Sequence, residues 1–189
     1  IAVEKLPQKI STIADTFFDE PTKNIKLLGI TGTNGKTTCA LLAAQLLAHV
    51  SKKPTGVIGT LGYTLLDTKN STTLAQQIQH FAVTGLTTPD AIKLQSLFAD
   101  FQKAKAASAV MEVSSHSLHQ HRAAAVNFTT AIFTNLSQDH LDYHGDMQTY
   151  GKVKAGLLSF QGLQQAIVNM DDAWASSLVA VAPASLKVW

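Results

Sequence analysis

Short apolar runs alternate with longer helical patterns along most of this chain. The runs predict strands over residues 25–30, 56–61, 108–113, 128–134 and 166–170, and the start of another over 186–189. Between them, apolar residues at helical spacing predict helices over 36–50, 89–105, 146–160 and 172–182. Strands that alternate with helices are typical of an α/β fold, in which a parallel sheet is covered by helices on both faces.

Capping residues support several of these boundaries. Thr88 is the expected N-cap of the helix over 89–105, with Pro89 in its first turn, and Asp146 is the expected N-cap of the helix that follows it. Residues 1–24 read as a leading helix and linker, in which Pro21 ends the helix. Such parallel sheets place ligands at the carboxyl ends of their strands, so the residues of a functional site are expected there.

Composition narrows the class of protein. Of the 189 residues 46% are hydrophobic and 15% are charged, which is typical of a globular domain. The net charge of +2 gives no support for a nucleic-acid or membrane surface. A single cysteine, Cys39, permits no intrachain disulfide and is interpreted as a small core residue. Without an apolar span of about 18–20 residues or a signal-peptide pattern, we expect a cytoplasmic protein.

The first candidate site is a phosphate loop at Thr31–Thr38, between a strand and a helix. Gly32 and Gly35 let successive backbone N–H groups turn toward phosphate oxygens. Lys36 can reach the outer phosphates of ATP, and the Thr37 hydroxyl can bind Mg²⁺. Ile30 departs from the general pattern, which has glycine six residues before the lysine.

A second candidate site follows the strand over 108–113. Glu112 ends that strand and is a candidate Mg²⁺ ligand, although a lone glutamate at a strand end is usually just solvated. Ser114, Gln120 and Arg122 follow at spacings that suit a polar cleft. Arg122 is suited to hold an anionic substrate, because its guanidinium matches a carboxylate or phosphate in shape and charge.

A third candidate site follows the strand over 128–134. Two histidines, two aspartates and a tyrosine lie within residues 139–144, a composition that favours metal or substrate binding. No cysteine ligands accompany them, so a tetrahedral zinc site is not indicated. Further along, Lys154 lies in the helix over 146–160. Spacing alone does not single it out from an ordinary surface lysine.

Together these stretches resemble the Mur ligase family, and within it the MurE branch. They are TGTNGKTT (31–38), GT-L-G (59–62), TTPD (87–90), MEVSSHSLHQHR (111–122), FTNLSQDHLDYHGDM (133–147) and YGKVKAGLL (150–158). The resemblance implies a P-loop NTPase-like central ATP-binding domain over 25–189. Residues 1–24 would end an N-terminal UDP-binding domain, and a C-terminal amino-acid-binding domain would be absent. The chain begins without methionine and stops in an apolar stretch, so we expect a fragment of a longer polypeptide.

The resemblance also implies roles for individual residues. ATP would be bound by Gly32, Thr33, Asn34, Gly35, Lys36, Thr37, Thr38 and Asn135. Two Mg²⁺ ions would be held by Thr37, Glu112, His140 and a carbamylated Lys154. UDP-MurNAc-L-Ala-D-Glu would be bound by Thr87, Thr88, Ser114, Gln120 and Arg122. Lys36, His140 and Lys154 would be the catalytic residues.

The implied activity is an ATP-dependent ligase of peptidoglycan synthesis. The dipeptide carboxylate would become an acyl phosphate, and the amino group of meso-diaminopimelate or L-lysine would then displace phosphate. Nothing in the sequence chooses between these amino acids or gives an oligomeric state, and we expect the fragment alone to be inactive. Two alternatives remain open: another ligase of the superfamily, such as a folylpolyglutamate synthetase, or a non-catalytic nucleotide-binding module.

Overall fold

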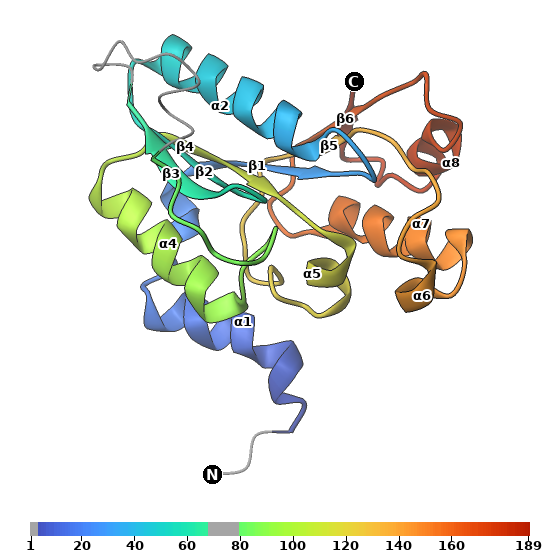
Figure 1. Ribbon diagram of the computed structural model, residues 1–189, viewed down its shortest axis with the longest axis horizontal. Helices are drawn as coiled ribbons and strands as arrows, with labels where there is room; N and C mark the ends of the chain where they lie inside the picture. The colour runs from blue at the N-terminus through green and yellow to red at the C-terminus, as the bar shows by residue number, and fades with distance from the viewer. Residues whose placement is uncertain (1–3, 68–79) are drawn as a thin grey trace.

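The computed structural model describes residues 4–67 and 80–189, which form one seven-stranded sheet with helices on both sides (Figure 1). The strand order across the sheet is β3-β2-β4-β1-β5-β6-β7. Every neighbouring pair is parallel except β2 and β3. The strands are β1 (Lys26–Thr31), β2 (Thr55–Gly59), β3 (Gly62–Leu66), β4 (Ser108–Glu112), β5 (Thr130–Phe133), β6 (Gln165–Val168) and β7 (Lys187–Val188).

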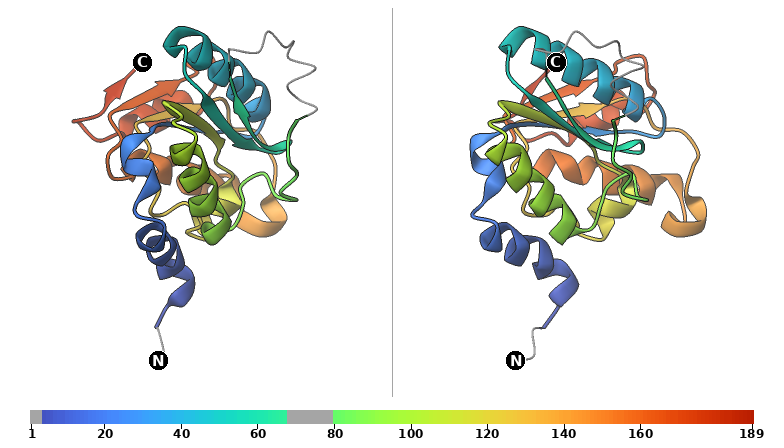
Figure 2. Two further views of the ribbon diagram at one scale, coloured as in Figure 1. Left: turned by 90° about the vertical axis from the view of Figure 1, so that its left-hand side faces the viewer. Right: turned by 60° about the vertical axis from the view of Figure 1, so that its left-hand side comes forward.

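The helices divide between the two faces of the sheet. Helix α2 packs on one face, and α4, α5 and α7 lie on the opposite one (Figure 1). Helix α1 packs against α4 and extends past the sheet (Figure 2). The α-helices are α1 (Leu6–Phe17), α2 (Lys36–Ser51), α4 (Ala91–Lys103), α5 (Ser115–His119), α6 (Leu141–His144), α7 (Met147–Ala155) and α8 (Ala175–Ala180), and the 3-10 helices are η1 (Pro21–Asn24) and η2 (Gly156–Ser159).

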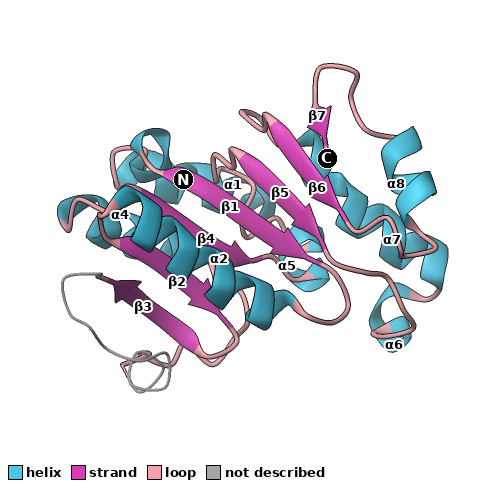
Figure 3. Ribbon diagram, turned by 90° about the horizontal axis from the view of Figure 1, so that it is seen from above, coloured by secondary structure: helices cyan, strands magenta, loops and turns pink. Residues whose placement is uncertain are grey.

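The central strands are apolar because both of their faces are covered. In β4 every residue is buried, and successive side chains enter different cores. Val110 packs with the alanines of α2, whereas Ala109 and Met111 pack with the larger core beneath α4. Strand β1 lies between β4 and β5, so the carboxyl ends of these three strands meet at one edge of the sheet (Figure 3).

Most of the predicted elements are confirmed, with three corrections. The strand predicted over 56–61 is β2 followed by a tight turn into the antiparallel β3, which the sequence interpretation missed. The helix predicted over 172–182 is only the short α8. The short helices α5 and α6 were also not predicted, while residues 1–3 of the leading segment lie outside the described part.

One predicted cap is confirmed and the other is wrong. The Asp146 side chain accepts a hydrogen bond from the Thr149 N–H at 2.6 Å, as an N-cap should. Asp90, not Thr88, caps α4: its Oδ1 accepts from the backbone N–H groups of Ile92 and Lys93. Thr88 lies two residues too early and directs its hydroxyl to the end of β4 instead.

Asp15 in α1 gives a prediction about stability. Its side chain is 9% exposed, and within the described residues its Oδ1 has no hydrogen-bond partner. Burial raises the pKa of Asp15, and the charge of Glu20 adds to this, while Lys23 opposes it. A raised folded-state pKa means that the folded chain holds this proton more tightly. The free energy of unfolding therefore falls as pH rises from the unfolded pKa through the folded one.

We therefore expect Asp15→Asn to raise the melting temperature at neutral pH, because it removes a buried charge whose Oδ1 has no hydrogen-bond partner among the described residues. Below about pH 3 the gain should vanish, because the carboxyl is then protonated in both states. Thermal unfolding across this pH range measures it. The exposed Asp171→Asn serves as control. A melting temperature for Asp15→Asn that is unchanged or lower at neutral pH would contradict the prediction.

Candidate functional site

The phosphate loop leaves β1 at the centre of the carboxyl edge and enters α2 at Lys36. Gly32 has φ +149° and Gly35 has φ +81°, conformations that side chains disfavour. At Gly32 a Cβ atom would also lie 1.9 Å from Thr134 Oγ1. The glycine at this position is therefore required both by the backbone conformation and by the closeness of the neighbouring segment.

That neighbouring segment, residues 134–137 after β5, braces the loop. The Asn34 N–H donates to Asn135 Oδ1 at 2.9 Å, and Asn135 Nδ2 returns a hydrogen bond to Asn34 O at 3.1 Å. Thr134 Oγ1 also donates to Asn34 O, at 2.7 Å. Thr33 N–H donates to Asn135 O at 2.9 Å. The loop is thus shaped by the end of β5, and Asn135 is one of the residues that fix it.

Two lysines converge on a single carbonyl of the loop. Lys36 Nζ donates to Gly32 O at 2.9 Å and to Thr33 O at 2.8 Å, and Lys154 Nζ donates to the same Gly32 O at 2.8 Å. Lys154 is 1% exposed. Burial lowers the pKa of Lys154 to about 7, and the charge of Lys36 adds to this. Burial also lowers the pKa of Lys36.

Glu112 ends β4 as a buried carboxylate held by Thr60. The Thr60 N–H donates to Glu112 Oε1 at 3.0 Å, and the Thr60 hydroxyl donates to Oε2 at 3.0 Å. A Cβ on Gly59 would lie 2.1 Å from Oε1, so the glycine makes room for the carboxylate. The Thr60 hydroxyl also lies 3.2 Å from that of Thr87. The turn between β2 and β3 therefore orients Glu112 and links it to Thr87.

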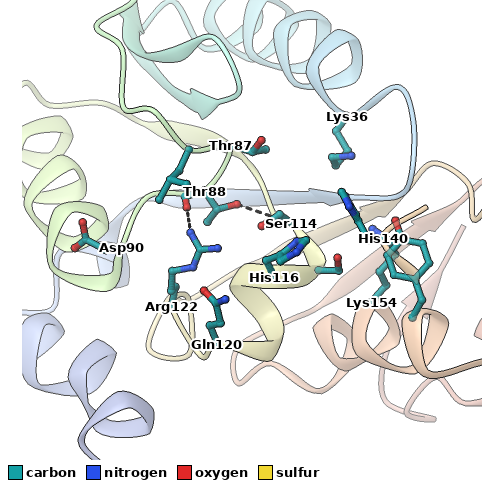
Figure 4. Close-up of a pocket in the computed structure, with 13 residues that line it drawn as sticks. Lys36, Thr87, Thr88, Asp90, Ser114, His116, Gln120, Arg122, His140 and Lys154 are labelled. Carbon is teal, nitrogen blue, oxygen red and sulfur yellow. Dashed lines mark hydrogen bonds between the residues drawn. The ribbon is translucent and has the colours of Figure 1, made fainter. Parts of the chain in front are cut away.

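A cavity of about 610 Å³ joins Lys36 and Lys154, beside the phosphate loop, to a second polar cluster (Figure 4). Thr88 organises this cluster: its hydroxyl donates to Glu112 O at 2.7 Å and accepts from Ser114 N–H at 3.1 Å. Its own carbonyl accepts a hydrogen bond from Arg122 Nη1. The cavity is lined by Lys36, Leu86, Thr87, Thr88, Asp90, Ser114, Ser115, His116, Gln120, Arg122, His140, Tyr150 and Lys154.

Arg122 belongs to the half of the cavity away from the loop. Its Nη1 donates a hydrogen bond to the Thr88 carbonyl, and its Nε has no hydrogen-bond partner among the described residues. A guanidinium carries five N–H donors, so this one keeps donors for an anion. Lys36 and Lys154 line the same cavity. Three basic side chains around one cavity favour a ligand with several negative charges.

Histidine and tyrosine rings pack along one wall. The ring centroids of His116 and His140 are 4.8 Å apart, and His116 and Tyr143 are 4.2 Å apart. His144 is buried, with Nε2 2.9 Å from Ser115 Oγ. Burial, and then the charges of nearby basic groups, lower the pKa values of His116 and His144. Both shifts favour the neutral form of the imidazole, at His116 and at His144.

The donor set suits Mg²⁺ only in part. In the described ranges, 4–67 and 80–189, no group of three or more His, Cys, Asp and Glu side chains is arranged to hold a metal. Mg²⁺ usually takes one or two carboxylates and completes its shell with phosphates and water, which a single carboxylate such as Glu112 with a nearby hydroxyl can satisfy. Lys154 as an ammonium would repel a cation, so only its carbamate would suit one.

The structure brings half of the predicted site residues together around one cavity. Eight of them line the cavity: Lys36, Thr87, Thr88, Ser114, Gln120, Arg122, His140 and Lys154. Others lie outside its lining: Gly32, Thr33, Asn34 and Gly35 in the loop, Thr37 and Thr38 at the start of α2, Glu112 behind Thr60, and Asn135 beside the loop. Their roles with ligands remain predictions.

Sequence reasoning missed three residues that shape the site. Thr60 orients Glu112, Tyr150 and His116 line the cavity, and none was named as a candidate. The stretch GT-L-G contained Thr60, but a threonine in a turn carries no chemical signal by itself. Tyr150 lies four residues before Lys154, one helical turn away, which places both on the same face of α7.

Comparison with known proteins gives one family. Residues 30–189 match the family model described as the Mur ligase middle domain. A UDP-N-acetylmuramoyl-L-alanyl-D-glutamate--2,6-diaminopimelate ligase of Coxiella burnetii is 45% identical over 180 residues, 95% of this chain and 34% of that protein. Its namesake in Pseudomonas aeruginosa is 41% identical over 175 residues, 91% of this chain and 33% of that protein. The chain thus spans about a third of the length of these curated relatives.

Solved structures agree with the family match. A structure of a UDP-N-acetylmuramoyl-L-alanyl-D-glutamate--2,6-diaminopimelate ligase superposes with TM-score 0.80 and 31% identity over 100% of this chain and 36% of that one. The folylpolyglutamate synthase of Mycobacterium tuberculosis complexed with ADP and AMPPCP gives TM-score 0.69 and 20% identity, over 95% of this chain and 46% of that one. At that identity the likeness extends to the fold alone. Among the described residues no helix is long and apolar enough to cross a membrane.

Proposed function

The chain belongs to the Mur ligase family, and on that premise we propose that it is the central, ATP-binding part of an ADP-forming ligase. The reaction would join an amino acid to UDP-MurNAc-L-Ala-D-Glu in peptidoglycan synthesis. Residues 25–189 would form the central domain, and residues 1–24 would end an N-terminal UDP-binding domain. A C-terminal domain outside this chain would bind the amino acid. The names of the relatives favour diaminopimelate over lysine as that amino acid.

One observation carries the proposal: a single cavity is lined by lysines beside the phosphate loop and by a polar cluster around Arg122 in its other half. Lys36 and Lys154 line it beside the loop, and Arg122, Thr88 and Ser114 line its other half (Figure 4). A ligase that activates a carboxylate must bring that carboxylate to the terminal phosphate of ATP. A cavity with cationic groups in both halves supports this use, because it offsets the repulsion between two anions.

The proposed chemistry has two steps. In the first, an oxygen of the D-glutamyl γ-carboxylate forms a bond to the γ-phosphorus of ATP, the bond to the β–γ bridging oxygen breaks, and ADP leaves. In the second, the amino group bonds to the carbonyl carbon, the carbon–oxygen bond to phosphate breaks, and the nitrogen loses a proton. Lys36 would stabilise charge on the transferring phosphoryl group, and Arg122 would hold the substrate in line.

Mg²⁺, when bound, would neutralise negative charge on the transferring phosphoryl group. Thr37 and Glu112 would hold one ion. His140 and the carbamate of Lys154 would hold the second. Carbamylation needs a neutral amine, and a pKa of about 7 leaves much of the Lys154 amine neutral at physiological pH. The neutral amine would add to the carbon of CO₂ and release a proton to solvent, which leaves a carbamate anion that suits a divalent metal.

The test of the proposed function is an ADP-release assay with the full-length protein. We expect release of ADP that depends on both UDP-MurNAc-L-Ala-D-Glu and diaminopimelate, with lysine a poor replacement. Activity with a folate and glutamate instead would favour a folylpolyglutamate synthetase. Binding of nucleotide without turnover on any of these substrates would favour a non-catalytic module. The 189-residue chain alone should release little ADP, since it spans about a third of the length of its ligase relatives.

A further inference from the structure

Tyr150 of α7 contacts both Lys154 and Thr33 of the phosphate loop. Its side chain is 1% exposed, yet it lines the cavity. Its ring lies under the Lys154 ammonium, with Nζ 4.6 Å from the ring centroid. The ring also packs against His144 at 5.1 Å and His140 at 6.2 Å between centroids. The Tyr150 ring is therefore held in place by its contacts with Lys154, His144 and His140.

Its hydroxyl reaches the phosphate loop. Tyr150 OH lies 3.3 Å from Thr33 Oγ1. The Thr33 hydroxyl already donates its hydrogen to Ser137 O at 3.1 Å and accepts from Ser137 N–H at 3.0 Å. A hydroxyl has one hydrogen and two acceptor positions, so the remaining position of Thr33 can only accept. With the Thr33 hydrogen on Ser137 O, Tyr150 is the donor in this contact, and burial raises the pKa of its hydroxyl.

Thr33 itself has backbone contacts with the lysine of the loop. Its carbonyl accepts from Lys36 Nζ at 2.8 Å, and its N–H donates to Asn135 O at 2.9 Å. The preceding Gly32 carbonyl accepts from Lys154 Nζ. Loss of the Tyr150 hydrogen bond would therefore loosen the loop at the residue whose carbonyl holds Lys36. The same side chain also supports Lys154 through its ring.

We propose that Tyr150 is a positioning residue, which holds Thr33 of the phosphate loop in one fixed arrangement through its hydroxyl and thereby raises affinity for nucleotide. The inference rests on the proposed function to the extent that the loop binds ATP. Tyr150 would act through Thr33. A buried, charge-free hydrogen bond at a loop is worth about 1 kcal/mol, which corresponds to roughly a fivefold change in affinity.

The test measures the affinity of the chain for ADP with Mg²⁺ by calorimetry, at a temperature where every variant is folded. We expect Tyr150→Phe to weaken binding about fivefold to tenfold. The same change made in a Thr33→Val background should have little further effect, because the hydrogen bond is already gone. In a Thr33→Ser background, which keeps the hydroxyl, the full effect of Tyr150→Phe should return. Tyr63→Phe on the edge strand β3, outside the cavity lining, is the matched control and should leave affinity unchanged.

Wild-type affinity in Tyr150→Phe would overturn the inference. So would an equal loss in the Thr33→Val and Thr33→Ser backgrounds, since the effect would then not pass through the Thr33 hydroxyl. A general loss of stability would lower the melting temperature without this dependence of affinity on the background. If the wild-type chain binds no ADP, the proposed function fails, and this inference fails with it. Phenylalanine keeps the ring and its volume, so the variant is expected to fold.

Discussion

Replacement of Lys154 by alanine should abolish ligase activity in the full-length protein while leaving nucleotide binding largely intact. The Lys154 side chain is buried beside the phosphate loop, and the proposed role of its carbamate is to support a metal ion. Loss of one preorganised charged group at a transferring phosphoryl group costs on the order of a hundredfold or more in rate. We expect a loss of at least that size in substrate-dependent ADP release, with a short-chain carboxylate such as acetate restoring part of it.

Lys152 offers a matched control for this experiment. It lies on the same helix two residues earlier but is exposed. Lys152→Ala should keep wild-type activity, and added carboxylate should not change it. Wild-type turnover in Lys154→Ala would remove Lys154 from the mechanism. Loss of turnover together with loss of ADP binding would show that the lysine shapes the loop through Gly32 and has no separate role in catalysis.

Gly32→Ala should prevent productive nucleotide binding. The new Cβ would lie 1.9 Å from Thr134 Oγ1 and 3.1 Å from the Asn135 backbone, at a residue whose φ is +149°. The loop or the end of β5 must therefore move, and Thr134 would lose its hydrogen bond to Asn34 O. We expect ADP affinity to fall about a hundredfold or more and the chain to lose about 1–3 kcal/mol of stability, as overpacking and a strained backbone typically cost.

Two further variants separate the clash with Thr134 from the general effect of replacing a glycine by alanine. Gly156→Ala lies in η2, where φ is −54° and nothing stands within 4 Å of the new Cβ, so affinity and stability should stay near wild type. Thr134→Ala in the Gly32→Ala background removes the clashing hydroxyl and should recover part of the stability. If Gly32→Ala binds ADP as well as the wild type, the loop does not have the shape described for it. Calorimetry and thermal unfolding provide both readouts.

The sequence predicted the scaffold of the site well because that scaffold is local. A buried strand, a glycine turn and a helix follow one another over residues 25–50, and each carries its own pattern. The edge strand β3 was missed because it has no helix before it: a two-residue turn at Thr60–Leu61 reverses the chain inside one apolar run. The cap of α4 was misplaced because Thr88 and Asp90 are both good caps, and only tertiary contacts decide between them.

The site residues were predictable from the sequence mainly where they belong to a distinctive motif. A glycine-rich loop with lysine is distinctive, whereas Lys154 was singled out only by the family resemblance and by spacing alone resembles a surface lysine. The fold places its ammonium on the Gly32 carbonyl, 122 residues earlier. Thr60 and Tyr150 were missed for the same reason. Thr60 contacts Glu112 and Tyr150 contacts Thr33, and each partner is distant in sequence. Residues that act by orienting others carry no signal of their own in a single sequence.

Transfer of oxygen from the substrate carboxylate to phosphate tests the proposed ligase reaction most directly. The γ-carboxylate of the D-glutamyl residue in UDP-MurNAc-L-Ala-D-Glu would be labelled with heavy oxygen, and the phosphate released by the full-length protein would be analysed by mass spectrometry. Formation of an acyl phosphate predicts one heavy oxygen in each phosphate released, because the attacking carboxylate oxygen leaves with the phosphoryl group. Released phosphate without label would contradict the proposed attack of the carboxylate on ATP.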